Sequence, residues 1–357
     1  MKTEGKSMEE KFSDAPDILK RIREKRIGGQ VAPDAPKISV VIPAYNAAAF
    51  IVETLDSVFR QTFENYEVIL VNDGSTDTAD LKAALIPYFN KIIYAEQSNS
   101  GAAKARNTAI CLARGDFLAF LDGDDIWSPE FLASQVNFLE QKNLEMVYCD
   151  ALLFGEPLFE GRNYMQDAPS DGEVSAAALI GGQCNVITSG TILKKDLLVK
   201  NGMFDAEVSS MGMEDFDLWF RLAQNGAKIG YQRKVLLKYR VRPNSLSGSN
   251  VRRTERTLFA YQTIERKYNL TDAETAILNE RRQTATAEHH LETGKFHLTE
   301  GNYVEAQTHF AEANKYYRKP KLALVNFLMR FSPRLTVLLF KKMRPSEFSF
   351  ILPKNVE

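Results

Sequence analysis

The sequence predicts an α/β fold, a mostly parallel sheet with helices on both faces, followed by a C-terminal helical extension. Short apolar runs of strand length alternate with helical patterns between residues 37 and about 150. The runs are mostly apolar, as in strands that are buried on both faces. From about residue 250 onward no strand pattern recurs. We therefore expect a polar N-terminal arm over 1–36, an α/β domain over 37–250 and a helical extension over 251–357.

The first half of the α/β domain alternates between strand and helix patterns. KISVVIP, a β-branched run that ends at a proline, predicts a strand over 37–43. The next residues place Phe50, Leu55 and Phe59 on one helical face. Further strands are expected at 67–71, 91–95, 117–121 and 146–150, with helices through Leu81 and Leu85 and over about 102–114.

The second half of this domain, about 155–235, is less regular and rich in loops. A strand-like segment covers 186–193, a helix begins near Met213, and 229–241 is expected to be extended. Contacts to an acceptor are expected from 155–212, where loop shape decides specificity.

The composition is that of a globular protein and gives no electrostatic case for nucleic acid. Of 357 residues, 44% are hydrophobic and 25% charged, and the net charge is −1. The three cysteines, without a CxxC spacing, are expected to be small buried hydrophobes in a reducing compartment. The N-terminus lacks a signal-peptide pattern, and no run reaches the roughly 18 to 20 apolar residues of a spanning helix. We expect a cytoplasmic protein, with peripheral attachment to the inner face of the membrane left open.

Polar residues follow each of the first four predicted strands. Ligands of open α/β sheets bind at the carboxyl ends of strands, so these residues are expected to meet at one edge. They are Pro43-Ala44-Tyr45-Asn46, then Asn72 to Asp77, then Asn99 and Gly101 leading to Arg106-Asn107, and finally Asp122-Gly123-Asp124-Asp125.

Their chemistry is that of a nucleotide site without a glycine loop for phosphate. Tyr45 offers a ring face to a base, and Asp73 can accept hydrogen bonds from a base or a ribose. Neither GxGxxG nor GxxxxGK occurs. The acidic turn at 122–125 can instead hold Mg²⁺ or Mn²⁺, which prefer carboxylate and phosphate oxygens. Each motif alone also fits a simple turn or a helix cap, and only their joint placement favours function.

Residues 37–245 resemble the family 2 glycosyltransferases of the GT-A fold. VVIPAYN at 40–46, VNDGSTD at 71–77, NSGAAKARN at 99–107, FLDGDD at 120–125 and MEDFDLWFRL at 213–222 occur in that family's order and spacing. The resemblance implies an inverting transfer of sugar from a nucleoside diphosphate donor, such as a UDP-sugar, to a hydroxyl acceptor. Synthesis of a cell-surface polysaccharide or glycolipid is the expected setting, with a glycan or glycolipid as the acceptor.

The resemblance also implies roles for individual residues. Asp73 is expected to recognise the base, Gly101 and Lys104 to lie beside the ribose and phosphates, and Asp124 to hold the metal. Arg106 and Asn107 are expected to organise the site. The remaining expected donor contacts are Pro43, Ala44, Tyr45, Asn46, Asn99, Asp122, Gly123 and Arg242.

Asp215, in the segment Glu214-Asp215-Phe216-Asp217, is the expected catalytic base. Transfer needs a carboxylate that removes the proton of the attacking hydroxyl. The alternative is that Glu214 and Asp215 only favour a helix N-terminus. Trp219 is expected in the helix core, with a sugar platform as the alternative, so Glu214 and Trp219 are assigned to the acceptor or to site organisation.

One position departs from the family pattern. A histidine that often precedes a proline in this region is here Arg242. A guanidinium cannot ligate a cation, but it can contact a diphosphate directly. Two other functions stay open: a metal-dependent nucleotidyltransferase, or an inactive scaffold with a transferase fold. The sugar, the linkage, the acceptor and the oligomeric state are not readable from the sequence.

The helical extension carries two further patterns. Residues 287–317 resemble one tetratricopeptide-type hairpin, and the simpler alternative is a helical pair packed on the main domain. Its four histidines are expected at the surface. Between 313 and 346 there are nine Lys or Arg and no acid, interleaved with apolar residues. This segment, 315–344, is expected to contact an anionic membrane surface, unless the apolar residues pack on the protein and the cations are only solvated. The basic residues are Lys315, Arg318, Lys319, Lys321, Arg330, Arg334, Lys341, Lys342 and Arg344.

Overall fold

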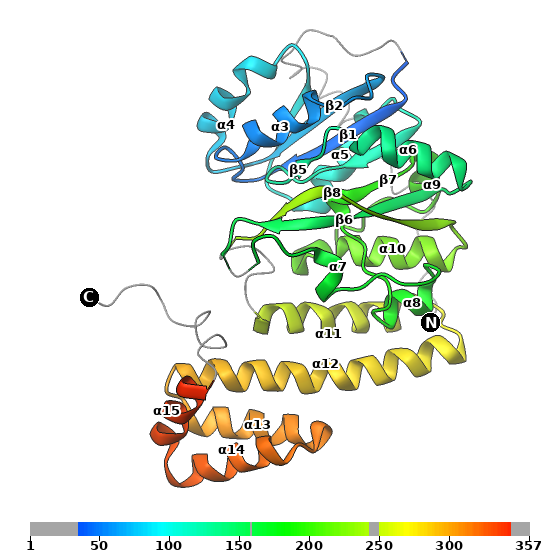
Figure 1. The fold of residues 1–357 in the computed structure, drawn as a ribbon. Coiled ribbons are helices and arrows are strands. Elements are labelled where there is room, and N and C mark those ends of the chain that lie inside the picture. The colour runs from blue at the N-terminus through cyan, green and yellow to red at the C-terminus, as the bar shows by residue number, and fades with distance from the viewer. Residues whose placement is uncertain (1–34, 158, 243–249, 344–357) are drawn as a thin grey trace. The chain divides into compact units, whose positions relative to one another are not determined.

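The computed structural model describes residues 35–157, 159–242 and 250–343. All but the last two residues of the expected N-terminal arm lie outside this range. The chain divides into two compact units, Met1–Arg242 and Pro243–Glu357. An α/β unit precedes a helical unit (Figure 1).

The α/β unit alternates strands and helices as the sequence predicts, with additional short elements in its second half. Its strands are β1 (Ile38–Ala44), β2 (Tyr66–Asp73), β3 (Ile93–Gln97), β4 (Phe117–Phe120), β5 (Ile126–Trp127), β6 (Met146–Phe154), β7 (Thr191–Lys194) and β8 (Ile229–Arg240). Its helices are α3 (Ile51–Phe59), α4 (Thr78–Leu85), α5 (Ala102–Leu112), α6 (Phe131–Gln141), α7 (Tyr164–Asp167), α8 (Ala176–Ile180), α9 (Lys195–Lys200) and α10 (Glu214–Gln224), with 3₁₀ turns η1 (Ile86–Tyr88), η2 (Thr188–Gly190) and η3 (Ser209–Met211).

The eight strands form one sheet in the order β3-β2-β1-β4-β7-β6-β8-β5. Strands β3, β2, β1 and β4 are parallel, and Val40 of β1 stands opposite both Val68 and Ala119. Strand β7 is antiparallel to β4 and to β6, and β6 is parallel to β8. Therefore β6 and β8 run in the same direction as β1, and the carboxyl ends of all these strands lie at one edge of the sheet.

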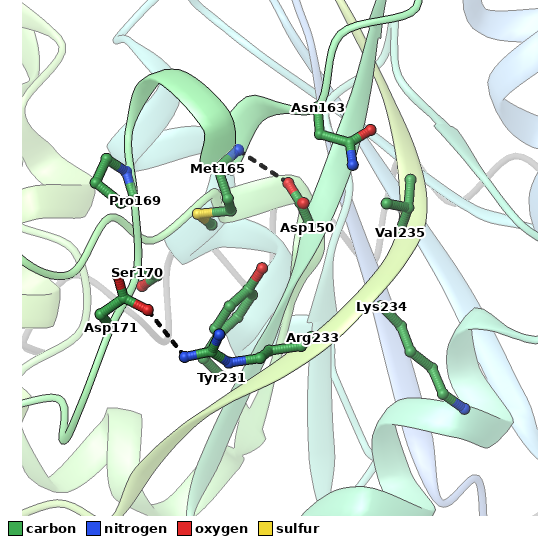
Figure 2. A pocket seen from close by; sticks show the side chains of 10 residues that line it. All are labelled: Asp150, Asn163, Met165, Pro169, Ser170, Asp171, Tyr231, Arg233, Lys234 and Val235. Atoms are coloured by element: carbon green, nitrogen blue, oxygen red, sulfur yellow. Dashed lines mark hydrogen bonds and ion pairs between the residues drawn. The ribbon is translucent and has the colours of Figure 1, made fainter.

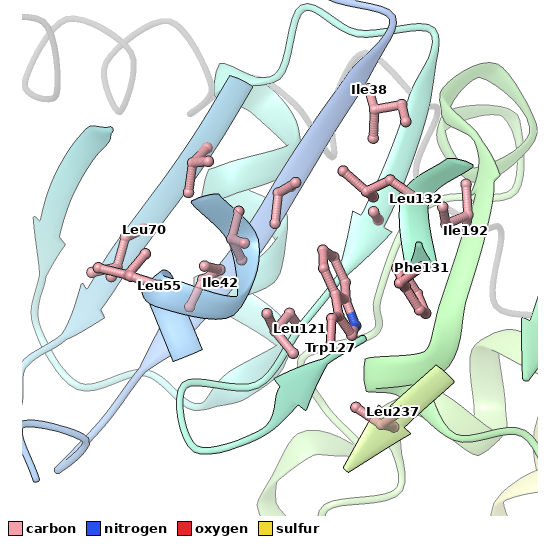
Figure 3. Close-up of a cluster of buried hydrophobic side chains, with 14 of the residues drawn as sticks. Ile38, Ile42, Leu55, Leu70, Leu121, Trp127, Phe131, Leu132, Ile192 and Leu237 are labelled. Atoms are coloured by element: carbon pink, nitrogen blue, oxygen red, sulfur yellow. The ribbon is translucent and has the colours of Figure 1, made fainter. Parts of the chain in front are cut away.

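Two apolar layers cover the sheet. On one face, Ile38, Val40 and Ile42 of β1 pack with α3, α4 and α6, and Trp127 stacks on Phe131 at 4.1 Å between ring centroids (Figure 3). On the other face, Val41 packs in a layer with residues of α5, α8 and α10. Because side chains alternate along a strand, the apolar residues of 38–42 serve both layers.

The structure differs from the sequence expectation in two of the expected strands, and it adds β5, α6 and the short helices α7, α8 and α9. Strand β3 begins at Ile93, where its pairing with β2 starts, and Ile92 before it is buried in the core. The segment 186–193 is not one strand, since η2 precedes β7. Strand β7 is an antiparallel insertion within the mostly parallel sheet.

The helical unit contains α11 (Asn250–Lys267), α12 (Asp272–Thr299), α13 (Tyr303–Tyr317), α14 (Pro320–Phe331) and α15 (Pro333–Met343). Gly294 of α12 lies against the ring of Phe310 on α13, where an added Cβ would approach a ring carbon to 2.7 Å. Leu298, Ala306 and Met329 complete this small core. Among the described residues, no helix combines the length and apolar character that crossing a membrane requires.

The four histidines are not simple surface residues, which corrects the sequence expectation. All four are half-buried: His290, His297 and His309 lie where α12 packs on α13, and His289 contacts Thr254 of α11 at 3.0 Å. His290 Nδ1 and His309 Nδ1 are 2.9 Å apart, and the rings of His297 and His309 stack at 5.5 Å. Burial lowers the pKa of His309, and the charges of neighbouring histidines lower it further against the opposing effect of Glu312.

Candidate active site

The loops that follow β1 and β2 are fastened to each other. Asn46, at φ 51°, accepts hydrogen bonds through Oδ1 from the backbone and hydroxyl of Thr76, both at 2.9 Å. Ser75 accepts from the Asn46 amide at 3.1 Å, and Asp77 accepts from the Ala48 amide at 2.9 Å. Tyr45 projects from this junction with 49% of its surface exposed, although it is a large aromatic residue. An exposed ring on a fixed loop can stack on a nucleobase.

Asp73 anchors the loop after β3. Its two oxygens accept hydrogen bonds from Gln97 Nε2 at 2.7 Å and from the amides of Ser100 and Gly101 at 2.9 and 2.8 Å. The side chain is buried. A carboxylate has about four lone-pair positions, so roughly one is left for a further hydrogen-bond donor.

Two glycines allow these loops to approach each other. Gly74, at φ +64°, would place a Cβ only 2.5 Å from the Asn99 amide nitrogen. Gly101 has φ +88° and directly precedes α5. Its amide donates to Asp73, which holds the turn in place. Asn99 and Lys104 are exposed beside this turn. The loop therefore presents polar groups toward solvent at the sheet edge.

The acidic turn follows β4. Gly123 lies beneath α3, where an added Cβ would meet the Ala47 Cβ at 3.2 Å and the Pro43 carbonyl at 3.4 Å. Asp125 is buried and accepts from the Arg240 amide at 2.8 Å. The Asp122 amide donates to Ser189 Oγ at 3.1 Å. The turn is thus fixed from three sides, with its carboxylates close together.

Arg242 forms an ion pair with Asp124. Its Nη2 lies 2.8 Å from Asp124 Oδ2, and the guanidinium lies over the Phe50 ring at 5.1 Å. Arg240 reinforces the turn, because its Nε donates to the Asp124 carbonyl at 2.8 Å. Burial raises the pKa of Asp124 and the charge of Asp122 adds to this, while Arg242 and Arg240 oppose it. The arginine that replaces the family histidine therefore neutralises the expected metal ligand.

Arg106 joins the acidic turn to the start of α10. Its Nη2 contacts Asp122 Oδ1 at 2.7 Å, and its Nη1 contacts Glu214 Oε1 at 2.8 Å. The guanidinium also lies over the ring of Phe204 at 5.4 Å. Burial opposes the charge of Arg106, but Asp122 and Glu214 outweigh it and raise the pKa of the guanidinium. Burial likewise raises the pKa of Glu214, Arg106 opposes that change, and Asp215 adds to it.

Asp215 lies in the first turn of α10 and is less enclosed than Glu214. Its Oδ1 accepts from the Phe216 amide at 2.7 Å, and its Oδ2 accepts from Thr188 Oγ1 at 3.1 Å. Glu214 is buried and forms an ion pair with Arg106, whereas Asp215 is only half-buried. Of the two carboxylates, Asp215 is therefore the more accessible.

Asn107 and Trp219 lie behind the site. Asn107 exchanges two hydrogen bonds with the backbone of Phe204, at 2.8 and 3.1 Å. Trp219 is fully buried and meets the Phe204 ring edge-on. A sugar platform at Trp219 is therefore wrong. Phe204 packs against the side chain of Arg106. Asn107 and Trp219, which hold Phe204, therefore support the ion pairs of Arg106.

The carboxylates fit a hard divalent cation only with help from a substrate. Among the residues that the structure describes, no group of three or more His, Cys, Asp or Glu is placed to hold a metal. Mg²⁺ is commonly held by one or two carboxylates together with substrate phosphates and water. Asp124 and Asp122 satisfy that donor set, and Arg242 would have to release Asp124 at least in part.

Several site residues have no counterpart in the sequence expectation. Thr188 and Ser189 contact Asp215 and Asp122, while Arg240 holds Asp125 and Gln97 holds Asp73. The signal for Thr188 and Ser189 is a polar Thr-Ser-Gly run inside an otherwise apolar segment.

A separate cavity of about 260 Å³ opens beside β6 and β8 (Figure 2). Arg233 and Asp171 form an ion pair at 2.9 Å in its wall, and Tyr231 lies between the Arg233 guanidinium and the Tyr148 ring. None of the residues expected to bind the donor lines it. It is lined by Asp150, Asn163, Met165, Pro169, Ser170, Asp171, Tyr231, Arg233, Lys234 and Val235.

Known proteins resemble this chain in sequence. The model of glycosyl transferase family 2 matches residues 39–197. The UDP-Glc:alpha-D-GlcNAc-diphosphoundecaprenol beta-1,3-glucosyltransferase WfaP of Escherichia coli is 30% identical over 219 residues, which are 59% of this chain and 80% of that protein. The putative teichuronic acid biosynthesis glycosyltransferase TuaG of Bacillus subtilis is 29% identical over 242 residues, 65% of this chain and 89% of that protein. Two glycosyltransferases of Rickettsia typhi and Rickettsia prowazekii are each 30% identical, and the match spans 64% of their length.

Solved structures resemble the fold. The mannosyltransferase PcManGT from Pyrobaculum calidifontis, solved in complex with GDP-Man and Mn²⁺, superposes with a TM-score of 0.57 at 20% identity, over 96% of each chain. This likeness confirms the predicted GT-A fold.

Proposed function

Because the chain belongs to glycosyl transferase family 2, we propose that it transfers a sugar from a nucleoside diphosphate donor to a hydroxyl acceptor, with inversion at the anomeric carbon. The observation that carries the proposal is the position of Asp215, which is linked to the acidic turn through Glu214 and Arg106. The half-buried carboxylate of Asp215 and the acidic turn at 122–125, which is the proposed diphosphate site, then lie at the same edge of the sheet.

Asp215 acts as the general base in this proposal. Thr188 donates to its Oδ2 and the Phe216 amide donates to its Oδ1, so the carboxylate has a fixed orientation. Asp215 removes the proton from the acceptor hydroxyl as its oxygen attacks the anomeric carbon. The bond from that carbon to the diphosphate breaks on the opposite side, and the proton stays on Asp215 until solvent takes it. Glu214, tied to Arg106, keeps α10 in position.

The donor lies along the loops after β1, β2 and β3. Tyr45 stacks on the base, Asp73 and Gly101 lie beside base and ribose, and Lys104 approaches the phosphates. Asp124, with Asp122 beside it, would hold Mg²⁺ or Mn²⁺, which supplies positive charge to the departing diphosphate when bound. Arg242, released from Asp124, can then contact the diphosphate itself.

A UDP-sugar is the first donor to test, and a glycan or glycolipid of the cell surface is the proposed acceptor. WfaP is named for a UDP-Glc donor and a diphosphoundecaprenol-linked acceptor, and TuaG for teichuronic acid biosynthesis. Such acceptors place the enzyme in the cytoplasm or at the inner face of the membrane.

A panel of nucleotide sugars with and without Mn²⁺ tests the proposal by thermal shift. A donor at about 100 times its Kd adds roughly 2.7 kcal/mol, or about 5 to 10 °C for a unit of this size. Incubation of the stabilising donor with candidate acceptors should then release nucleoside diphosphate. Release of pyrophosphate would identify a nucleotidyltransferase instead, and absence of any stabilising nucleotide would favour an inactive scaffold.

A further inference from the structure

Helices α14 and α15 expose an unusual amount of apolar surface. Phe331 is 73% exposed, Leu338 is 64%, and Leu324, Phe327 and Leu335 are each 55%. Phe327 and Phe331 also contact each other, with ring centroids 5.0 Å apart. Isolated exposed apolar residues are ordinary, but a group of them marks an interaction site. Together with Leu328 these residues are called the α14–α15 surface below.

The exposed face of α14 is distinct from the face that folds the unit. Leu322, Val325 and Met329 pack toward Phe310 in the small core of the helical unit. Leu324, Phe327, Leu328 and Phe331 have the spacing i, i+3, i+4, i+7, which places them on one stripe. At about 100° per residue this stripe points away from the core face. The apolar residues of α14 therefore serve two surfaces, and internal packing accounts for only one.

The charges around the exposed stripe are all positive. Lys321 and Arg330 flank it on α14, and Arg334 lies in the first turn of α15 beside Leu335. Among the described residues, none of these three side chains has an acidic partner. The sequence contains no Asp or Glu between 313 and 346. A protein partner that covered the stripe would need acidic residues around an apolar centre, and an anionic lipid surface offers both features at once.

We propose that the α14–α15 surface lies in the headgroup region of an anionic phospholipid membrane, with its apolar side chains at the acyl boundary. Helices of 12 and 11 residues are too short to span a bilayer but suit this interfacial position. Aromatic and leucine side chains enter the interface, while Lys321, Arg330 and Arg334 contact lipid phosphates. The inference goes beyond the proposed transfer reaction and uses no residue of the candidate active site, so either can fail alone.

Sedimentation of the full chain with vesicles tests it. Wild-type protein should pellet with vesicles of phosphatidylcholine and phosphatidylglycerol, remain in the supernatant with pure phosphatidylcholine, and release as salt is raised. Lys321→Gln, Arg330→Gln and Arg334→Gln together should weaken partitioning by about 100-fold. Phe327→Ser with Phe331→Ser should weaken it at least as much.

Matched controls separate the surface from general charge and hydrophobicity. Lys91→Gln, Lys142→Gln and Lys200→Gln remove the same charge from exposed positions of the α/β unit. Phe296→Ser with Val304→Ser removes two exposed apolar residues from α12 and α13. Both control variants should partition like the wild type. The charge variant keeps the test valid if the phenylalanine variant proves unstable by circular dichroism.

Three results would overturn the proposal. The first is equal recovery of wild-type protein in the supernatant with and without anionic vesicles. The second is equal loss of binding in the control variants. The third is a wild-type dimer that Phe327→Ser with Phe331→Ser converts to monomer in light scattering, since a second copy would then cover the surface.

Discussion

Replacing Arg106 by methionine should strongly destabilise the α/β unit. The side chain is 6% exposed and holds Asp122 and Glu214 at 2.7 and 2.8 Å, and Glu214 is itself 7% exposed. Methionine preserves much of the length and the contact with Phe204, but it leaves Glu214 as an uncompensated buried charge. Removing one partner of a buried pair costs about 3 to 5 kcal/mol. For a unit of this size that is a fall in Tm of about 6 to 20 °C.

A double-mutant cycle with Glu214→Gln measures the part of this cost that belongs to the pair. The glutamine removes the stranded charge, so Arg106→Met with Glu214→Gln should lose less than the sum of the two single variants. The expected difference is about 1 to 3 kcal/mol. Thermal and urea unfolding, followed by near-ultraviolet circular dichroism, provide the four free energies. A fall in Tm below about 2 °C for Arg106→Met, or additivity within about 0.5 kcal/mol, would refute the role assigned to this arginine.

Three further predictions follow from named contacts. Asp124→Ala should weaken donor binding and remove the dependence of that binding on Mn²⁺, as measured by calorimetry. If the wild type transfers sugar in the presence of EDTA, Arg242→Ala should abolish that activity. Full activity of Arg242→Ala in EDTA would exclude this arginine as the counter-charge of the diphosphate. Thr188→Val should lower kcat about 10- to 100-fold with an unchanged donor Kd, because the hydroxyl donates to a carboxylate; a change confined to Kd would contradict this. The helical unit should lose stability as pH falls through about 6.5, because the lowered pKa of His309 lets the unfolded chain bind more protons than the folded one. His309→Gln should flatten that dependence in thermal melts recorded from pH 5 to 8, and an unchanged slope would count against the histidine cluster.

The main strands could be predicted from sequence because burial on both faces leaves a strong local pattern. The runs 38–42 and 67–71 are apolar except for Ser39 and Glu67, which hydrogen-bond to each other at 2.7 Å, and both strands have a neighbouring strand on each side. Strand β5 has only two residues, which is too short for any periodicity. Helices α7, α8 and α9 have four to six residues, below the length at which a helical pattern is readable.

The candidate site could be predicted only where its residues follow strands directly. The loops after β1, β2, β3 and β4 converge because parallel strands end at one edge. Pairings across the chain were not readable: Arg106 and Glu214 are 108 positions apart, and Asp215 meets Thr188 from a different element. The 3₁₀ turn η2 interrupts the expected strand, and it brings the Thr188 hydroxyl to the Asp215 carboxylate and the Ser189 hydroxyl to the Asp122 backbone amide.

The proposed mechanism depends most directly on Asp215. The decisive measurement is the rate of nucleoside diphosphate release from the stabilising donor in the presence of acceptor, compared between the wild type and Asp215→Asn. The amide keeps the shape of the carboxylate but cannot take the proton, so the rate should fall by about 10² to 10⁴ while the donor Kd stays within about twofold. A turnover close to that of the wild type would contradict the assignment of Asp215 as the base.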